Sequence, residues 1–291
     1  MMTRRTILFG AGAIPMAAAV KTDRPMLCLF SKHLPKLGYE ELGKACKKLG
    51  FDGVDLTVRP KGHVLPENVE QHLPLAVKAL RAHGLSVPMI TTGLTSTDDP
   101  AAEPTIATAA ALKVPFFKLG YWRYGEVGVL TRIAQVQRDT LGLVALAEKH
   151  GIVAGFHNHS GPYVGEAVWD IREIIRGMDP DRIGYYFDPC HATAEGGRFG
   201  WQAKLQIALE RLKMVAIKDF YWKKTNGKWR MTMCPMGKGM VDWERFFSTL
   251  ARNRFTGPVS LHVEYEAADE MAAISADFAF VKRMVDKAYG A

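Results

Sequence analysis

The chain has 291 residues, of which 48% are hydrophobic and 23% are charged, and its formal net charge is +8. This composition is typical of a globular chain long enough for one large core, and because Lys and Arg are spread along the sequence it argues against a nucleic-acid partner. The four cysteines are far apart and show no CxxC spacing, which argues against a zinc knuckle and a disulfide framework.

The first 20 residues have the features of an export signal. Arg4 and Arg5 precede an uncharged run over residues 6–20 that contains three consecutive alanines suited to cleavage. The phrase "TRRTIL" resembles the twin-arginine pattern, which directs folded proteins across a membrane. The run is too short and too rich in Gly, Ala and Pro for stable membrane insertion. We therefore expect a twin-arginine-type signal over residues 1–20 and a periplasmic or otherwise exported protein.

One pattern then recurs along the chain: an amphipathic helix, a glycine and a short apolar run. It is seen in "ELGKACKKLGFDGVDL", "AVKALRAHGLSVPMI" and "LVALAEKHGIVAGF", while "AALKVPFFKL" carries Lys113 where the glycine would be. Gly50, Gly84 and Gly151 supply the left-handed residue that commonly ends a helix. Strands that alternate with helices predict a parallel sheet.

The number of these units predicts the architecture. We expect strands near residues 26–31, 52–57, 86–91, 115–119, 152–157, 182–188, 213–218 and 258–264. Eight strand–helix units over residues 26–288 match a (β/α)8 TIM barrel in number and size, and no linker interrupts them. An open, doubly wound sheet is the alternative, but no GxGxxG phrase follows an early strand to support it.

Polar side chains gather at one predicted end of this barrel. Of the nine histidines, six follow predicted strand ends, namely His33, His63, His157, His159, His191 and His262. Asp188 ends the sixth predicted strand, and strand alternation puts Ser260, His262 and Glu264 on one face. Barrel enzymes keep their active sites at the carboxyl ends of the strands. Convergent Asp, Glu and His side chains predict a site there for Mn, Co, Zn or Mg.

Four phrases resemble a known family. "FDPCHA", "VAIKDF", "CPMGKGMVDWERFF" and "GPVSLHVEY" are similar to the sugar phosphate isomerase/epimerase family, whose xylose-isomerase-like barrels include ketose 3-epimerases, inosose dehydratase and endonuclease IV. The likeness spans residues 26–288. In ketose epimerases of this family, a Glu, an Asp, a His and a Glu on strands five to eight hold one divalent metal. The two glutamates also act as acid and base.

The resemblance transfers only in part. It makes Asp188 and Glu264 metal ligands and gives His191, in the loop after strand six, a substrate contact. His157 replaces the strand-five glutamate, as in the inosose-dehydratase-like branch, and Ala216 replaces the strand-seven histidine. The candidate metal ligands that remain are His157, Asp188, Glu264 and either His262 or His159.

Lys218 leaves two interpretations open. It has the same strand parity as Ala216, so its ammonium is expected in the barrel mouth beside Asp188 and Glu264. It either neutralises these carboxylates or stabilises an enolate oxygen in place of a metal. A Schiff base is less favoured because nothing in the sequence indicates a lowered pKa. The candidate catalytic residues are therefore Glu264, His157 and Lys218.

Loops after the second and fourth strands supply further candidates for contact with a sugar. Aromatic and basic side chains in "TVRPKGHVLPENV" and "KLGYWRYGE" suit a sugar ring and its hydroxyl or anionic groups, and they suit a homo-oligomer interface equally. The predicted substrate-binding residues are His191, Arg59, His63, Lys118, Arg123 and Asp219. The phrase "TNGK" predicts a hairpin turn over the barrel mouth.

These residues predict an exported carbohydrate isomerase or epimerase, or a keto-glycoside lyase, that removes a proton next to a carbonyl and forms an enolate. Export argues against a sugar phosphate substrate, because phosphorylated sugars are cytosolic. The alternative is a metal-free sugar-binding protein on a degenerate barrel, which the loss of a histidine at Ala216 supports. A nuclease similar to endonuclease IV ranks third, because its three zinc ions need more ligands than the sequence offers.

The export signal makes a direct prediction. Replacing Arg4 and Arg5 with lysine should retain the protein in the cytoplasm, because the twin-arginine route requires the arginine pair. Cell fractionation with an immunoblot measures this in a host that has the translocase, and the same host without it is the control. Unchanged export of the doubly substituted chain would contradict the assignment.

Overall fold

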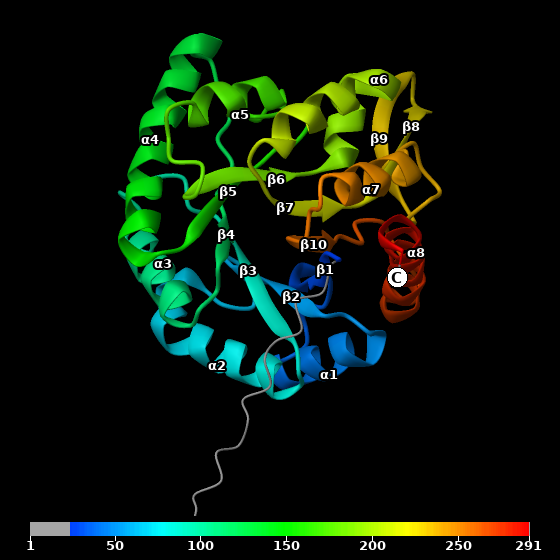
Figure 1. The fold of residues 1–291 in the computed structure, drawn as a ribbon, viewed down its shortest axis with the longest axis horizontal. Helices are drawn as coiled ribbons and strands as arrows, with labels where there is room; N and C mark the ends of the chain where they lie inside the picture. Colours follow the sequence, from blue (N-terminus) through cyan, green and yellow to red (C-terminus); the bar gives the residue numbers. More distant parts are fainter. Residues whose placement is uncertain (1–23, 291) are drawn as a thin grey trace, which may run out of the picture.

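Eight parallel strands close into a barrel in the computed structural model, which describes residues 24–290 (Figure 1). Their order around the barrel is β1-β10-β7-β6-β5-β4-β3-β2. Their bounds are β1 (Met26–Phe30), β2 (Gly53–Val58), β3 (Ser86–Thr92), β4 (Phe116–Lys118), β5 (Val153–His157), β6 (Ile183–Phe187), β7 (Leu212–Ile217) and β10 (Pro258–Leu261). The predicted (β/α)8 barrel is confirmed, whereas the predicted signal segment lies outside the described residues.

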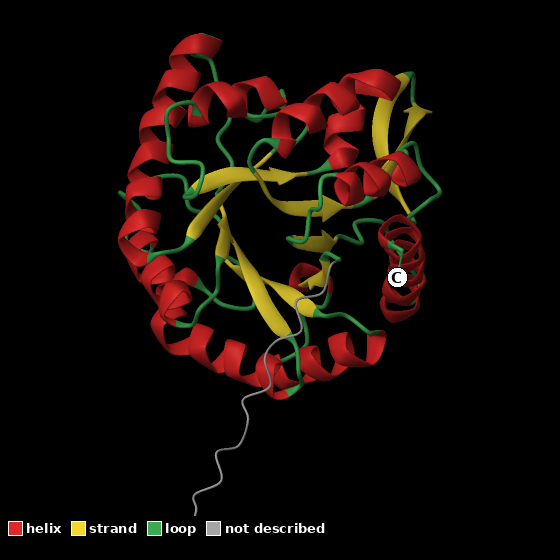
Figure 2. Cartoon of the chain, in the orientation of Figure 1, coloured by secondary structure: helices red, strands yellow, loops and turns green. Residues whose placement is uncertain are grey.

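Helices form a ring around the barrel (Figure 2). They are α1 (Tyr39–Leu49), α2 (Val69–Ala82), α3 (Ala102–Ala111), α4 (Val129–His150), α5 (Val168–Ile175), α6 (Pro189–Leu209), α7 (Trp243–Arg252) and α8 (Glu270–Tyr289). Two short 3-10 turns, over Ser31–His33 and Pro66–Asn68, follow β1 and precede α2. Within the described part of the chain, none of the helices is long and apolar enough to cross a membrane.

The recurring glycines end helices in the expected way. Gly50 and Gly151 have φ of 96° and 74°, and each donates its backbone N–H to carbonyls of the last turn of α1 and α4. A residue without a Cβ adopts this left-handed conformation with little strain. Lys113 takes the same conformation after α3, with φ of 57°, although it has a Cβ. The departure of "AALKVPFFKL" from the pattern is therefore in the residue and not in the backbone.

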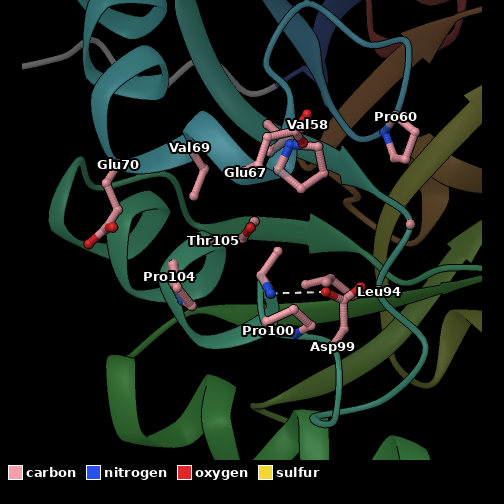
Figure 3. Close-up of a pocket in the computed structure, with 13 residues that line it drawn as sticks. Val58, Pro60, Glu67, Val69, Glu70, Leu94, Asp99, Pro100, Pro104 and Thr105 are labelled. Atoms are coloured by element: carbon pink, nitrogen blue, oxygen red, sulfur yellow. Dashed lines mark hydrogen bonds between the residues drawn. The ribbon is translucent and has the colours of Figure 1, made fainter.

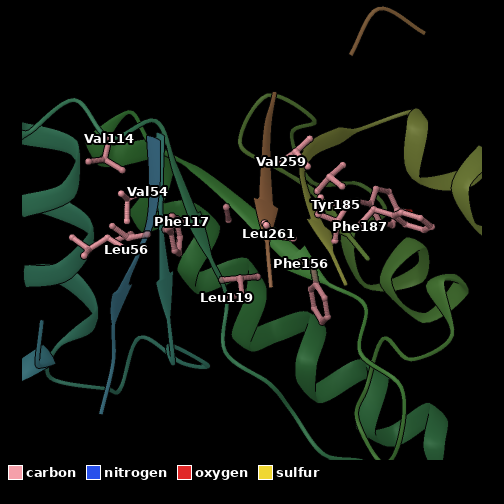
Figure 4. Close-up of a cluster of buried hydrophobic side chains, with 14 of the residues drawn as sticks. Val54, Leu56, Val114, Phe117, Leu119, Phe156, Tyr185, Phe187, Val259 and Leu261 are labelled. Atoms are coloured by element: carbon pink, nitrogen blue, oxygen red, sulfur yellow. The ribbon is translucent and has the colours of Figure 1, made fainter. Parts of the chain in front are cut away.

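Strand alternation divides the core into two layers. Outward-facing side chains such as Leu56 on β2 and Phe187 on β6 belong to a large apolar layer between the barrel and the helices (Figure 4). A small cluster fills the barrel interior, and it consists of Met89, Tyr186, Met214 and Ala216. Because residues two apart on a strand share a face, the next inward positions on β6 and β7 are those of Asp188 and Lys218 at the mouth. The interior cluster is thus the floor beneath the polar side chains.

Two local features differ from the expectation. The last barrel strand, β10, ends at Leu261, so His262 and Glu264 lie in the loop that follows it. The "TNGK" turn does join two antiparallel strands, β8 (Asp219–Thr225) and β9 (Lys228–Cys234), with positive φ at the Asn and Gly of the turn. This hairpin lies at the edge of the barrel beside α6 and α7, and not across the mouth as predicted (Figure 1).

The close approach of β6 and β7 makes a stability prediction. A Cβ at Gly184 would lie 1.9 Å from the carbonyl oxygen of Arg211 and 2.7 Å from Cγ of Lys213. Gly184→Ala should therefore lower the free energy of unfolding by about 1–3 kcal/mol, because backbone must move to admit the methyl group. Gly200→Ala on α6 is the control, since a Cβ there would meet no atom within 4 Å and alanine favours a helix. Urea denaturation measures both, and equal midpoints would contradict the predicted clash.

Candidate active site

A cavity of about 190 Å³ opens at the carboxyl ends of the barrel strands. All eight barrel strands are parallel, so side chains that are distant in sequence converge at this one mouth. Of the predicted site residues, those that line the cavity are Arg59, Lys118, His157, Lys218, His262 and Glu264. The structure therefore brings together the predicted catalytic residues and two of the predicted sugar contacts.

The ammonium of Lys218 lies between two carboxylates at the centre of the site. Its Nζ is 3.3 Å from Asp188 Oδ2 and 3.2 Å from Glu264 Oε2, and the side chain is only 3% exposed. Burial disfavours the charge, but the attraction of Asp188 and Glu264 outweighs it and raises the pKa of Lys218 above its ordinary value. Lys218 therefore stays protonated, which makes it a fixed cation and argues against a Schiff base at this residue.

The motif "FDPCHA" holds Asp188 in place. Its Oδ1 caps α6 by accepting the backbone N–H groups of Cys190 and His191, and the proline after it suits the first helical position. Asn158 accepts the backbone N–H of Asp188 at 2.8 Å and donates to its carbonyl at 3.0 Å. Because Oδ1 is committed to the helix, Oδ2 is the oxygen that faces Lys218.

His157 is the last residue of β5 and approaches Asp188 from the next strand. Its Nε2 is 3.4 Å from Asp188 Oδ2, its Nδ1 is 2.6 Å from the Tyr121 hydroxyl, and its ring stacks on Tyr186. Burial and then the charge of Lys218 lower the pKa of His157 well below 6.5. The imidazole is therefore neutral at pH 7, and its Nε2 has no hydrogen-bond partner.

His191 differs from its predicted position and role. It lies in the first turn of α6 and not in a loop, because Asp188 starts the helix directly after β6. Its Nδ1 is 2.8 Å from Ser160 Oγ, and its ring packs at 3.9 Å against His159, which lines the cavity. His159 therefore faces the cavity, whereas His191 does not line it and has its Nε2 3.6 Å from Asp188 Oδ2.

Glu264 is the carboxylate that reaches the cavity. Its side chain is 23% exposed, Oε1 accepts a hydrogen bond from Lys32 at 3.0 Å, and Oε2 pairs with Lys218. Burial opposes ionisation, but Lys218, with smaller contributions from His262 and Lys32, holds the pKa of Glu264 well below its usual range. His262 itself stacks on Phe30, with its Nδ1 4.0 Å from Glu264 Oε1.

A third carboxylate, which the sequence analysis missed, lies deeper in the barrel. Asp55 on β2 is fully buried and accepts hydrogen bonds from the hydroxyls of Thr91, Ser260 and Tyr186 at 2.7, 2.8 and 3.2 Å. Burial raises its pKa to about 6 despite these donors. Its place on the inward face of β2 was the available signal, but a lone Asp inside an apolar strand does not reveal its partners.

The predicted metal does not fit the residues as they are placed. Among residues 24–290, no group of three or more His, Cys, Asp or Glu side chains is arranged to hold a metal ion. The ammonium of Lys218 lies between Asp188 and Glu264, where a shared ion would have to bind, and Ala216 offers no ligand from β7. Asp188 Oδ2 and the Nε2 atoms of His157 and His191 lack hydrogen-bond partners. A dication could use them only against the repulsion of the adjacent ammonium.

Besides His191, three predicted substrate contacts lie outside the cavity and bond to other parts of the protein, namely His63, Arg123 and Asp219. His63 fastens the loop after β2, because its ring nitrogens face Thr57 Oγ1 at 3.3 Å and the Leu34 carbonyl at 3.2 Å. Arg123 lies on the rim, where it donates to the Tyr163 hydroxyl. Both side chains therefore lie outside the small cavity, and their predicted contact with substrate stays a prediction.

Asp219 is the third of these residues, and its hydrogen bonds explain the phrase "PMGKGMVDW". Its carboxylate accepts N–H groups from the backbone of residues 220, 237, 239 and 241 and from the Trp243 indole. A Cβ at Gly239 would lie 2.1 Å from Asp219 Oδ1, so the turn requires glycine there. The motif is therefore a clamp that ties the segment before α7 to the residue after Lys218.

A larger cavity, of about 470 Å³, lies beside the barrel mouth between the loops after β2 and β3 (Figure 3). Prolines and the acidic side chains of Glu67, Glu70 and Asp99 line much of it. It has no imidazole or basic side chain among its lining residues, in contrast to the smaller cavity. Size alone therefore does not mark the chemical site, and the convergent charges at the mouth do.

Several solved structures are similar to this chain over most of its length. The chain is similar to 3-keto-D-glucoside 4-epimerase from E. coli, at 15% identity and a TM-score of 0.72, over 89% of this chain and 100% of that one. It is similar to L-ribulose 3-epimerase, at 15% identity and 0.70, over 91% and 95%. It is also similar to the IOLI protein, solved with a bound zinc atom, at 17% identity and 0.74, over 91% and 100%. A search of curated proteins finds no match.

At these identities the structural likeness establishes the fold and not the reaction. The sequence itself matches a family model over residues 44–284, which is most of the chain and includes the residues of the barrel mouth from Arg59 to Glu264. The resemblance of the four sequence phrases is therefore confirmed, and the chain belongs to the xylose isomerase-like TIM barrel family.

Proposed function

We propose that the protein is a carbohydrate isomerase or epimerase that removes a proton from the carbon next to the carbonyl of a keto-sugar. The observation that carries this proposal is the buried ammonium of Lys218, held within 3.3 Å of Asp188 and Glu264 in a cavity at the barrel mouth. Epimerases with the same fold, one for a 3-keto-glucoside and one for L-ribulose, support the choice of reaction class.

Lys218 supplies the positive charge that an enolate needs. When the carbonyl oxygen of the substrate lies against Nζ, the charge that develops on that oxygen during proton removal is stabilised by a cation already in position. Asp188, fixed by α6 and Asn158, keeps this ammonium oriented and charged. Because Lys218 is almost fully buried, little water is present to screen this interaction.

Glu264 is the base in this mechanism. It is ionised, it faces the cavity, and its Oε2 shares Lys218 with the substrate oxygen. In the free protein Lys218 makes Glu264 a weak base, since it lowers the pKa of that carboxyl. When negative charge develops on the enolate oxygen, Lys218 interacts with that oxygen and therefore stabilises the ionised form of Glu264 less. The basicity of Glu264 then rises, so the carboxylate can accept the proton as the C–H bond breaks.

His157 is the complementary acid. The loop that carries Glu264 follows β10, and β5 lies three strands away around the barrel, so the two groups approach the substrate from different sides. Burial raises the pKa of Tyr121, so its hydroxyl keeps a proton that it can donate to His157 Nδ1. Nε2 then carries the imidazole proton; as Nε2 protonates the enolate, the Tyr121 proton moves to Nδ1, so the imidazole stays neutral and the negative charge passes to the Tyr121 oxygen. Return of a proton to the opposite face inverts the carbon, whereas departure of a neighbouring group completes an elimination.

The size of the cavity favours one sugar ring. At about 190 Å³ it is smaller than the roughly 300–1,000 Å³ of sites that bury larger organic ligands. We propose a keto-sugar or keto-glycoside rather than a sugar phosphate, on the strength of the export pattern at Arg4 and Arg5. Elimination from a keto-glycoside proceeds through the same enolate, so a lyase reaction is included in the proposal.

Glu264→Gln should reduce turnover by about 10²–10⁴-fold, because it removes the base and keeps its shape. The measurement is exchange of the proton next to the carbonyl in D2O, followed by NMR across keto-sugars and keto-glycosides. Glu266→Gln, at an exposed position two residues further on, is the matched control. Thermal melting verifies that both variants fold. If the wild-type protein binds sugars but exchanges, isomerises and eliminates none, the sugar-binding alternative replaces the enzyme.

Lys218→Met should reduce the same exchange by about 10²-fold or more, since it removes the cation at the enolate oxygen. Lys218→Arg, which keeps the charge, should retain more activity than Met. Dialysis of the wild-type protein against EDTA should leave turnover unchanged, and elemental analysis should find less than one equivalent of metal. Loss of turnover in EDTA that Mn, Co, Zn or Mg restores would transfer this role from Lys218 to a metal.

A further inference from the structure

Four basic side chains line the small cavity, and they differ in how they are paired. Lys32 and Lys218 each lie within 3.3 Å of a carboxylate oxygen. Arg59 and Lys118 make no hydrogen bond or ion pair through their side chains with any residue of the range 24–290. Both lie against aromatic rings instead: the Arg59 guanidinium is 5.6 Å from the Phe30 ring centre, and Lys118 Nζ is 3.4 Å from that of Tyr121.

Lys118 is the more unusual of the two. Its residue is 2% exposed, and it faces the cavity at the end of β4. Burial, and then the charge of Arg59, lower the pKa of Lys118 well below its ordinary value. The charge of Asp55 opposes this effect, but Asp55 already accepts hydrogen bonds from three hydroxyl donors deeper in the barrel. A buried amine without an acceptor, next to a second cation, is costly unless a ligand supplies the missing charge.

The arrangement selects the kind of ligand. A neutral hydroxyl could accept a hydrogen bond from each group, but it would leave the repulsion between Arg59 and Lys118 in place. A carboxylate cancels that repulsion, and its two oxygens match the planar guanidinium of Arg59. Both groups flank β3, which is four strands away from β7 in a ring of eight, so they lie across the mouth from Lys218.

We infer that the substrate is a keto-sugar acid whose carboxylate binds between Arg59 and Lys118 while its carbonyl lies at Lys218. This inference rests on the proposed function for the position of the carbonyl, but the carboxylate site stands on its own contacts. The sugar ring then spans the cavity from the wall at β2 and β4 to the wall at β7 and β10.

Binding of two matched probes tests the carboxylate site without catalysis. D-glucuronate and its neutral amide, D-glucuronamide, have the same ring and differ in charge, and calorimetry compares their affinities. Glucuronate should bind about 10- to 100-fold more tightly, as expected for charged hydrogen bonds. Arg59→Gln and Lys118→Met should each remove most of this preference. Lys78→Met, which removes one positive charge from the exposed face of α2, should preserve it.

Other results would overturn the inference. Equal affinities for the acid and the amide would do so, as would a preference that survives both variants once thermal melting has shown that they fold. Tighter binding of glucose 6-phosphate than of glucuronate would assign the pair to a phosphate instead of a carboxylate.

Exchange in D2O separates this inference from the proposed function. If a keto-uronate exchanges with a higher kcat/KM than its amide, both stand. If neutral keto-sugars exchange with the higher kcat/KM, the enzyme stands and the carboxylate site is wrong. If glucuronate is preferred in binding but no keto-sugar of either kind exchanges, the carboxylate site stands and the proposed function is wrong.

Discussion

Burial, together with the ammonium of Lys218 between Asp188 and Glu264, controls the charge of the histidines and of Glu264 at the barrel mouth. The ammonium contributes to the lowered pKa values of His157, His191 and His262, and it also lowers that of Glu264. The result is a site in which Lys218 and Glu264 are charged and the imidazoles are neutral. This division suits proton transfer, because neutral imidazole and ionised carboxylate can exchange protons with a substrate while the cation remains fixed.

The same interaction explains how the barrel departs from the ligand set of ketose epimerases in its family. Ala216 and Lys218 are two residues apart on the inward face of β7, and Ala216 packs into the interior cluster with Met89 and Met214. A small side chain at Ala216 leaves the space above the cluster to the lysine, which reaches the two carboxylates from the strand end. Where the resemblance implies a histidine, β7 carries Ala216, and the charge at the end of this strand is the ammonium of Lys218.

The parts of the site that lie on strands could be predicted from the sequence, because alternation and parallel order determine where such residues point. Asp188, Lys218 and His157 were placed in this way. The loop residues could not, since their positions depend on tertiary hydrogen bonds. Asp219 follows the inward-facing Lys218 by one residue, so it has the opposite parity, and its five N–H donors identify its carboxylate as a clamp. The pairing of Lys32 with Glu264 joins residues 232 apart, which no local pattern reveals.

The clamp at Asp219 also separates the hairpin of β8 and β9 from the chemistry. The chain leaves the barrel at Asp219, forms the hairpin, and returns to the same carboxylate at Gly237 and Gly239. The hydrogen bonds of Asp219 thereby join the start and the end of the hairpin segment at the residue that follows Lys218. The exposed residues at the tip of the hairpin, from Lys223 to Arg230, therefore lie outside the stretch of backbone that the carboxylate fixes next to the lysine.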